Sequence, residues 1–351
     1  MSLILEKSMT QTLAHDGAPA KVLTLSSDAG LSIVIMDIGA TWLSCQLDVD
    51  ESEKRELLLG VSNIDDFQNQ ECYLGATIGR YANRIEQGRF QIGDKTYQVD
   101  TNQAGNCLHG GRTGFDKKRW TLVEQTRNKA VLTLSSPDGE QGFPGNLAVS
   151  VTYQVTSDNT VDIRYHATTD SPTPVNLTNH AYFNLSAGET DCRTHQVRIN
   201  ADQYLPTNQN GIPLDKPVSV EGTGFDFRQS KTLAQDFLLD DQQNIAKGYD
   251  HSFVLNPVCR QGEVAAQVTS PDGKVQLSVF TDKPAMQLYT GNWLAGTPNR
   301  QQGKYIDYAG FALETQFLPD APNHPEWQQP SCILKPGEVY QFSTQYQFKT
   351  L

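Results

Sequence analysis

The residue of this sequence best suited to acid–base chemistry is His180, which lies in the segment Pro174–Leu185. Imidazole is the side chain whose unperturbed pKa lets it give or take a proton near neutral pH. The segment sets this histidine among three asparagines, two aromatic residues and several apolar ones. Asn and His are poor strand formers and are mostly exposed unless they are paired. Such a set suits a pocket for a polyhydroxylated ligand; the alternative is a buried histidine that is satisfied within a turn.

A second candidate for proton transfer is Glu314, which interrupts the strand-like run Phe311–Phe317. Glutamate is depleted in strands, so its presence here needs a reason. Its apolar neighbours would remove water from the carboxylate, and desolvation raises a carboxyl pKa toward a value that is useful for a general base. The alternative is that Glu314 points to solvent from an edge strand.

Two glycine-containing stretches supply further candidates. The stretch 75–90 carries Asn83 and Arg84, and its glycines are too far apart for a dinucleotide-binding loop. Either Arg84 and Asn83 present donors to ligand hydroxyls, or the arginines of this stretch form a solvated face. The stretch 107–117 has three glycines, which let a backbone approach a ligand closely, and it places His109 before a glycine pair. A single loop histidine is otherwise ordinary surface.

An aspartate with a neighbouring histidine, Asp250-His251, is framed by Tyr249 and Phe253. This pair is either catalytic or part of a turn that leads into the strand Phe253–Leu255. The residues alone leave both interpretations open.

The elements that must position these residues are mostly strands. Apolar residues alternate with polar ones over 147–155 and again over 161–165, which predicts a hairpin with its turn at 157–160. Similar strand and turn signals recur along the chain, and the best helix candidate is Thr232–Gln243. We therefore predict one domain over residues 1–351 with an all-β fold. Its expected architecture is a large antiparallel β-sandwich with little helix, rather than a series of β-α-β units.

Composition and charge restrict the partners. The formal net charge is -12, which argues against nucleic acid or an anionic membrane surface and is compatible with a neutral small molecule. No apolar run is long enough to span a membrane, and the N-terminus does not resemble a signal peptide. The six cysteines are scattered without a C-x-x-C pair, so we expect reduced thiols in a cytoplasmic protein. The acidic surface permits a monomer or a homodimer.

Several of these stretches belong to a larger pattern. Six motifs occur in one order along nearly the whole chain, and together they resemble the aldose 1-epimerase (galactose mutarotase) family. Any one of them is weak evidence, whereas six in the same order are specific. The motifs are Gly79–Ile85, Leu108–Lys117, Asn176–Leu185, Gly248–His251, Tyr289–Asn292, and Leu313–Gln316 with Pro319–Pro325.

The resemblance implies a single-domain β-supersandwich that interconverts the α and β anomers of free aldoses such as galactose and glucose. It implies no metal and no organic cofactor. By motif position it implies that His180 is the general acid and Glu314 is the general base. It also implies five residues that bind or orient the sugar, namely Asn83, Arg84, His109, Asp250 and Gln287.

The chemistry of mutarotation explains why an acid and a base are needed. The sugar ring opens when a proton leaves the C1 hydroxyl and a proton reaches the ring oxygen, and it closes on the other face by the reverse transfers. Glu314 must therefore start ionised and His180 protonated. A nearby carboxylate, such as Asp250, would help to keep His180 charged. An aromatic ring would cover the apolar C–H face of the sugar.

Two other functions remain open. An epimerase for a phosphorylated hexose would need extra cations for the phosphate. The arginines available for that role are Arg80, Arg84, Arg89 and Arg112. The Asn83-Arg84 motif fits the unphosphorylated branch better. A carbohydrate-binding or sensor protein would keep the residues that read hydroxyls, but it would not need both His180 and Glu314.

Overall fold

The computed structural model describes residues 2–186 and 191–351. Strands dominate these residues and the helices are few and short, so the predicted all-β class with little helix is confirmed. Residue 1 and residues 187–190, which belong to the predicted single domain, lie outside the described residues. None of the helices in the described ranges has the length and apolar character needed to cross a lipid bilayer.

Three antiparallel sheets organise the described part of the chain. The nine-stranded sheet contains, in spatial order, β10 (Thr121–Gln125), β11 (Lys129–Ser136), β12 (Leu147–Val155), β13 (Thr160–Thr169), β27 (Tyr340–Thr350), β23 (Val275–Thr281), β22 (Ala266–Thr269), β17 (Gln196–Ile199) and β20 (Lys231–Thr232). The six-stranded sheet contains β16 (Tyr182–Phe183), β25 (Phe311–Gln316), β24 (Ala285–Tyr289), β21 (Asp250–Leu255), β18 (Ala201–Leu205) and β19 (Val218–Ser219). The four-stranded sheet contains β1 (Val22–Ser26), β2 (Leu31–Met36), β3 (Thr41–Asp48) and β4 (Lys54–Glu56).

Shorter elements connect these sheets. The two-stranded pairs are β14 (Thr173–Pro174) with β26 (Ile333–Leu334), β15 (Thr178–Asn179) with β5 (Thr77–Ile78), β6 (Arg84–Ile85) with β9 (Cys107–Leu108), and β7 (Arg89–Ile92) with β8 (Lys95–Gln98). The α-helices are α1 (Ser2–Thr10), α2 (Ile64–Asn69) and α3 (Asp241–Ala246). The short 3-10 segments are η1 (Glu86–Gly88), η2 (Phe115–Lys117), η3 (Glu140–Gly142), η4 (Cys192–Thr194), η5 (Pro257–Gln261) and η6 (Ala321–Asn323).

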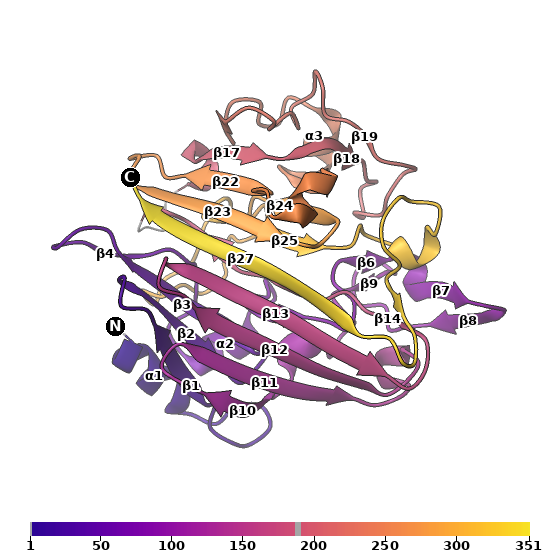
Figure 1. Cartoon of the computed structure of the whole chain (residues 1–351), viewed down its shortest axis with the longest axis horizontal. Helices are drawn as coiled ribbons and strands as arrows, with labels where there is room; N and C mark the ends of the chain where they lie inside the picture. Colours follow the sequence, from indigo (N-terminus) through magenta and orange to yellow (C-terminus); the bar gives the residue numbers. More distant parts are fainter. Residues whose placement is uncertain (1, 187–190) are drawn as a thin grey trace.

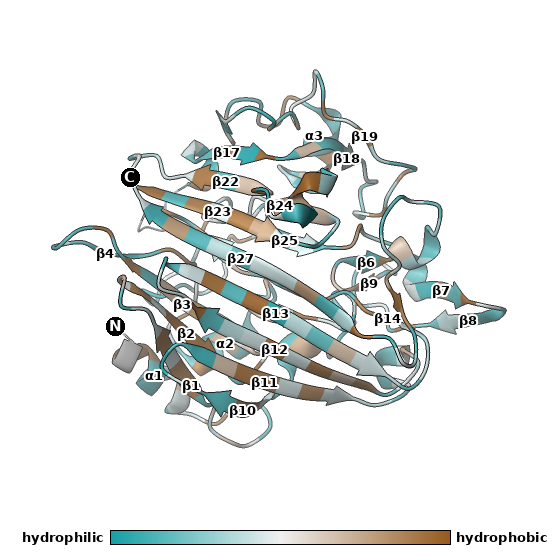
Figure 2. Cartoon of the chain, in the orientation of Figure 1, coloured by the Kyte–Doolittle hydropathy of each residue, from teal (hydrophilic) through white to brown (hydrophobic). Residues whose placement is uncertain are grey.

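The hairpin predicted from alternation is confirmed. Strands β12 and β13 pair in antiparallel register from Leu147 opposite Thr169 to Val155 opposite Val161. Bands of opposite hydropathy alternate along β13 (Figure 2), as a strand with one buried face requires. The nine-stranded sheet that contains this hairpin forms a broad layer running from β10 through β27 to β17 (Figure 1).

The helix predicted over Thr232–Gln243 is wrong. Most of that stretch consists of turns, and Leu238 has a left-handed backbone with φ 59°. The only α-helix there is α3, which begins after Asp240, whose carboxylate accepts a hydrogen bond from the backbone N–H of Gln242. Successive turns also bury apolar residues three or four positions apart, so the spacing of Leu233 and Phe237 does not distinguish turns from a helix.

The six-stranded sheet packs on the nine-stranded sheet through β25 and β27. The hydroxyl of Thr315 in β25 hydrogen-bonds to the hydroxyl of Thr344 in β27. Next to them, the ring of Phe183 in β16 lies 5.2 Å from the ring of Tyr346 in β27. Because side chains alternate along a strand, the neighbour of Thr315, Glu314, points to the opposite face of its sheet, away from β27.

The asparagines of the segment Pro174–Leu185 hold backbone rather than face a ligand. The amide of Asn176 donates to the carbonyl of Ala82 at 3.1 Å and accepts from the N–H of Phe317 at 3.0 Å. The amide of Asn179 donates to the carbonyl of Gly75 at 2.8 Å. The expectation that these polar groups serve a polyhydroxylated ligand is therefore wrong for these two side chains.

We expect the substitution Asn176→Ala to lower the free energy of unfolding by about 2–4 kcal/mol, because it leaves two buried backbone groups without a partner. Urea denaturation measures this change. Asn210→Ala is the matched control, since Asn210 is exposed and its loss should change stability by less than about 0.5 kcal/mol. Equal stability of the two variants would contradict the structural role of Asn176.

Candidate active site

A cleft of about 960 Å³ brings together most of the predicted site residues. Its walls include His180 and Glu314, the predicted acid and base. Predicted sugar-binding residues that line it are Asn83, Arg84, His109 and Asp250. Gln287 is not part of the lining and lies behind Asp250, to which its amide donates.

The register of the six-stranded sheet explains why these side chains share one face. Residues directly opposite each other in an antiparallel pair point to the same side. Asp250 of β21 lies opposite Tyr289 of β24, and Gln287 of β24 lies opposite Glu314 of β25. Because side chains two residues apart also share a face, Asp250, Gln287 and Glu314 all point away from β27.

Glu314 is not on an edge strand, contrary to the alternative drawn from the sequence. Its strand, β25, lies between β16 and β24, and the residue is only 2% exposed. The desolvation inferred from its apolar neighbours is therefore present, and it comes from strands on both sides.

His180 is positioned through its own backbone. Its N–H donates to the carbonyl of Ala76 at 2.9 Å, and its carbonyl accepts from the N–H of Gly75 at 2.9 Å. Gly75 has φ 69°, and a Cβ on it would lie 2.1 Å from the carbonyl oxygen of Trp42. Only glycine therefore fits at this position, where the chain runs close to both Trp42 and His180.

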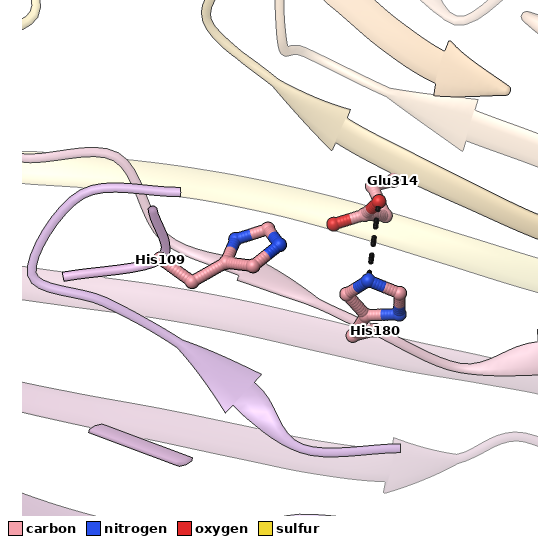
Figure 3. Close-up of side chains that lie close together, drawn as sticks. All are labelled: His109, His180 and Glu314. Atoms are coloured by element: carbon pink, nitrogen blue, oxygen red, sulfur yellow. Dashed lines mark ion pairs between the residues drawn. The ribbon is translucent and has the colours of Figure 1, made fainter. Parts of the chain in front are cut away.

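The predicted acid and base face each other in the cleft. Nε2 of His180 lies 3.6 Å from Oε1 of Glu314, and the ring of His109 completes the group (Figure 3). His180 is 4% exposed and Nδ1 of its ring has no hydrogen-bond partner among the described residues. A small hydroxylated molecule in this place would therefore meet two buried groups that can exchange protons with it.

Burial sets the charge state of this pair. Desolvation lowers the pKa of His180 to about 4, although Asp250 acts to raise it. Desolvation, and then the charge of Asp250, raise the pKa of Glu314 to about 8, while Arg84 acts to lower it. Near pH 7 both groups are mainly neutral, which corrects the expectation of an ionised Glu314 beside a charged His180. Asp250 does favour a charged His180, as expected, but burial outweighs it.

His109 is held in an unusual backbone conformation with a defined tautomer. Its φ is 53°, and its Nδ1 accepts a hydrogen bond from the backbone N–H of Asn83 at 3.1 Å. Burial holds the pKa of His109 well below its usual range, so the ring is neutral and its single proton sits on Nε2. Asn83 itself has φ 64°, a conformation that asparagine tolerates better than most residues.

The tautomer of His109 bears on whether the cluster suits a metal ion. Ligand atoms of His109, His180 and Glu314 lie within 4.8 Å of one another. A metal ligand must offer a lone pair, yet one nitrogen of His109 accepts from Asn83 and the other carries the proton. As oriented, His109 offers a donor, so the cluster fits a hydroxyl oxygen better than a cation.

Asp250 and Arg84 add two charged side chains to the lining of the cleft. Oδ1 of Asp250 accepts from the amide of Gln287 at 2.7 Å, and Oδ2 lies 3.9 Å from a guanidinium nitrogen of Arg84. The guanidinium also donates to Gln103 at 2.9 Å. Arg84 is thus part of the cleft rather than of a solvated face. Gln287 in turn accepts from Gln316 at 3.4 Å, an arrangement that orients its amide toward Asp250.

Aromatic residues around His180 were not predicted. The rings of Tyr73 and Tyr182 lie nearly parallel to the imidazole, at 5.8 Å and 4.9 Å between centroids. Tyr289 meets it edge-on at 6.5 Å, and Trp293 adds an exposed indole to the cleft. Tyr182 lies in the same motif as His180 and was open to prediction, whereas nothing in the sequence around Tyr73 connects it to His180.

Other residues considered from the sequence have structural roles. Arg80 is buried and donates to the carbonyls of Pro144 and Gly145. His195 accepts from the backbone N–H of Leu185 at 2.9 Å, away from the cleft lining. His251 points its Nδ1 at the N–H of Asp250, so in the Asp250-His251 pair only the aspartate lines the cleft.

Comparison with known sequences gives consistent matches. A family model described as aldose 1-epimerase matches residues 21–347. The chain is 50% identical over 339 residues to the aldose 1-epimerase of Escherichia coli (strain K12), covering 97% of this chain and 98% of that protein. It is 38% identical over 347 residues to the galactose mutarotase of Rattus norvegicus, covering 97% of this chain and 98% of that protein.

Solved structures agree with these matches. A galactose 1-epimerase from Lactobacillus acidophilus NCFM has a TM-score of 0.83 to this chain at 30% identity, with 97% of each chain covered. An aldose epimerase homologue from C. elegans has a TM-score of 0.86 at 27% identity, covering 95% of this chain and 99% of that one. The resemblance drawn from the six motifs is confirmed.

We expect Glu314→Gln to make the protein more resistant to unfolding at pH 8 than the wild type. The pKa of Glu314 is about 8 in the folded protein against an ordinary value of 4.5, so folding favours the protonated carboxyl. The stability of the folded wild type from a neutral side chain at position 314 is complete below pH 4.5 and is lost as the pH rises toward 8. Glutamine is neutral at every pH, so the variant does not lose this stability.

Thermal melting at pH 4, 6 and 8 checks this expectation. The Tm of Glu314→Gln should match that of the wild type at pH 4 and exceed it progressively above that pH. Glu51→Gln, at an exposed position, should follow the wild type throughout. A difference in Tm between Glu314→Gln and the wild type that is the same at all three pH values would contradict the raised pKa of Glu314.

Proposed function

This chain belongs to the aldose 1-epimerase family, and we propose that it interconverts the α and β anomers of free aldoses with His180 as general acid and Glu314 as general base. One observation carries this assignment, namely the buried contact of 3.6 Å between Nε2 of His180 and Oε1 of Glu314 in the cleft. Free hexoses such as galactose and glucose are the proposed substrates. The relatives of this chain are named aldose 1-epimerase and galactose mutarotase, which supports that choice.

The reaction moves two protons. Glu314 takes the proton of the C1 hydroxyl while His180 gives a proton to the ring oxygen, and the C1–O5 bond breaks to leave the open-chain aldehyde. Rotation about the C1–C2 bond exposes the other face of the aldehyde. The ring then closes as His180 takes a proton back from O5 and Glu314 returns one to the C1 oxygen.

The protonation state that the pair prefers matches the open-chain stage of this reaction. The reactive state, with Glu314 ionised and His180 protonated, contains the same number of protons as the state with Glu314 protonated and His180 neutral. Burial favours the second state, which is also the state of the pair after ring opening. The pair therefore stabilises the open-chain stage, and reaching the reactive state before it costs free energy in proportion to the difference between the two pKa values.

The remaining polar groups are proposed to bind the sugar hydroxyls. His109 offers the N–H of its Nε2 as a donor, Arg84 offers guanidinium donors, and Asp250 offers a carboxylate acceptor. Asn83 is proposed to act mainly by holding His109 and Arg84, since its N–H donates to His109 and its side-chain oxygen accepts from the N–H of Arg84 at 2.9 Å. Gln287 is proposed to orient Asp250 from behind.

A phosphorylated hexose is a poorer candidate substrate. Arg80 is buried among backbone carbonyls, and Arg89 is exposed on β7, outside the cleft lining. Arg84 lies in the cleft beside the carboxylate of Asp250, which would repel a phosphate. Arg112 also lines the cleft, but its side chain is 72% exposed and is paired with Asp100 at 3.0 Å. A binding or sensor function would not explain the buried proton-transfer pair.

Three further properties are proposed. The reaction needs no metal or organic cofactor, because proton transfers alone open and close the ring. The protein works as a monomer or a homodimer, which is compatible with a cleft lined by one chain. It resides in the cytoplasm, a proposal supported by six scattered cysteines that are free thiols.

We expect Glu314→Gln and His180→Asn each to lower kcat by about 10²–10⁴-fold, because each removes one positioned proton transfer. Polarimetry on freshly dissolved α-D-galactose and α-D-glucose measures the rate at which optical rotation reaches equilibrium. Glu51→Gln and His166→Asn, both at exposed positions, are the controls and should keep wild-type rates. A folded variant of either cleft residue with wild-type turnover would remove that residue from the mechanism.

The pH dependence of kcat/KM should be bell-shaped, with limbs near pH 4 and pH 8, because kcat/KM reports the groups of the free enzyme. Between the limbs the pair holds one proton, and the fraction in the reactive state does not change with pH. Below the acidic limb, both Glu314 and His180 are protonated, so no base is available. Above the basic limb, the pair has lost its last proton, so no acid is available. A single rise near pH 6.5 would contradict the shared proton.

A further inference from the structure

The mechanism above leaves Tyr73 without a role, although this residue contacts both imidazoles of the site. Its ring centroid lies 4.6 Å from that of His109, at an interplanar angle of 68°. It lies 5.8 Å from that of His180, at an angle of 23°. The two imidazoles are themselves 5.4 Å apart, so the three rings form one mutually packed group in the cleft wall.

The loop that carries Tyr73 is tied to the backbone of His180. The N–H of Gly75 donates to the carbonyl of His180, and the N–H of His180 donates to the carbonyl of Ala76, each at 2.9 Å. On the other side of Tyr73, the amide oxygen of Gln70 accepts from the N–H of Cys72 at 2.8 Å. The position of the Tyr73 ring relative to the imidazole is therefore set by short, direct connections.

The backbone of Tyr73 is held in a conformation that a bulky residue avoids. Its φ is 58°, in the left-handed region. The carbonyl of Tyr73 accepts a hydrogen bond from the N–H of Ala76 at 3.0 Å, which forms a tight turn from Tyr73 to Ala76. Strain of this kind persists only where the surroundings enforce it, and it is concentrated at functional sites. In this conformation the ring of Tyr73 packs against both histidines.

The aromatic face of Tyr73 has an electrostatic consequence. A π face attracts a cation, so a parallel ring stabilises an imidazolium more than a neutral imidazole. The proposed reaction needs His180 charged at the moment it protonates the sugar, in a site whose burial disfavours that charge. The hydroxyl of Tyr73 has no hydrogen-bond partner within the described ranges, so the ring is the part of the side chain whose contacts are defined.

We propose that Tyr73 is a positioning residue of the epimerase reaction, whose ring holds the two imidazoles and favours the charged form of His180 that protonates the sugar. The inference rests on the proposed roles of His180 and Glu314. It assigns Tyr73 no proton transfer of its own.

Other groups that face His180 also affect its charge. Asp250 favours the imidazolium, and so does Glu314 once it is ionised, whereas the charge of Arg84 opposes it and the neutral ring of His109 adds no charge. The aromatic neighbours besides Tyr73 are Tyr182 and Tyr289. The experiment therefore changes only the ring at position 73 and leaves these groups in place.

The test compares Tyr73→Phe and Tyr73→Leu with the wild type, using kcat and kcat/KM for α-D-galactose between about pH 2.5 and 9, so that a shifted acidic limb stays within the measured range. Tyr73→Phe keeps the ring and should stay within about three-fold of the wild type. Tyr73→Leu should lower the plateau of kcat/KM by about ten-fold and move the acidic limb down by about one pH unit. The lower plateau and the shifted acidic limb should occur together, because both result from a less stable imidazolium at His180.

A matched control and a shape-preserving variant complete the experiment. Tyr97→Leu removes a tyrosine ring from β8, outside the cleft, and should leave both the plateau and the limb unchanged. Pentafluorophenylalanine at position 73 keeps the ring shape but loses its negative face, so it should shift the limb as leucine does. This variant keeps the test valid where Tyr73→Leu fails to fold.

Several outcomes would overturn the proposal. A lower plateau with a fixed acidic limb would mean that Tyr73 supports the structure only, and a loss in Tyr73→Phe as large as in Tyr73→Leu would assign the role to the hydroxyl. Glu314→Gln, measured alongside, separates this inference from the proposed function. If Glu314→Gln retains wild-type activity, the acid–base assignment fails; if it is inactive and the Tyr73 variants match the wild type, only the role of Tyr73 fails.

Discussion

Desolvation of a carboxyl group and an imidazole side by side is the constraint on which the rest of the structure depends. In water, Glu314 and His180 would have ordinary pKa values, and neither would favour the state that follows ring opening. Inside the cleft, burial pushes the two pKa values in opposite directions, to about 8 and about 4. A site of this kind is useful only if both groups are held still, since mobile side chains would turn toward solvent and recover their hydration.

The scaffold meets this requirement with backbone connections rather than with a network of charges. Glu314 lies on β25, which pairs with a strand on each side, β16 and β24. His180 is hydrogen-bonded through its backbone N–H and its carbonyl. Asn176 and Asn179 join the segment of His180 to distant chain segments, so their amides secure the site without entering it. Asp250 is oriented by Gln287 from the same face of the sheet. The polar residues of the region thus divide into those that hold the cleft and those that face it.

Sequence patterns predict the local part of this arrangement and miss the long-range part. The alternation in β12 and β13 is visible because a period of two is a local property, and the motifs indicate His180, Glu314 and their polar neighbours by resemblance. The failed helix at Thr232–Gln243 shows that apolar spacing does not distinguish consecutive turns from a helix. Tyr73 was missed because its contact with His180 depends on a left-handed backbone and on pairing between distant segments. The charge state was also misjudged, because the extent of burial is a tertiary property.

Gly75 joins the acid of the site to the rest of the core. Its N–H donates to the carbonyl of His180, and its own carbonyl accepts from the N–H of Trp42 in the four-stranded sheet. The backbone of a single residue thus links the cleft to an inner strand of another sheet, without a flexible side chain between them. Local opening of the cleft around His180 would have to break these bonds and disturb the packing of Trp42 as well. The backbone amide hydrogen of His180 should therefore exchange as slowly as the amides of the core, because this wall of the cleft opens only when the core opens.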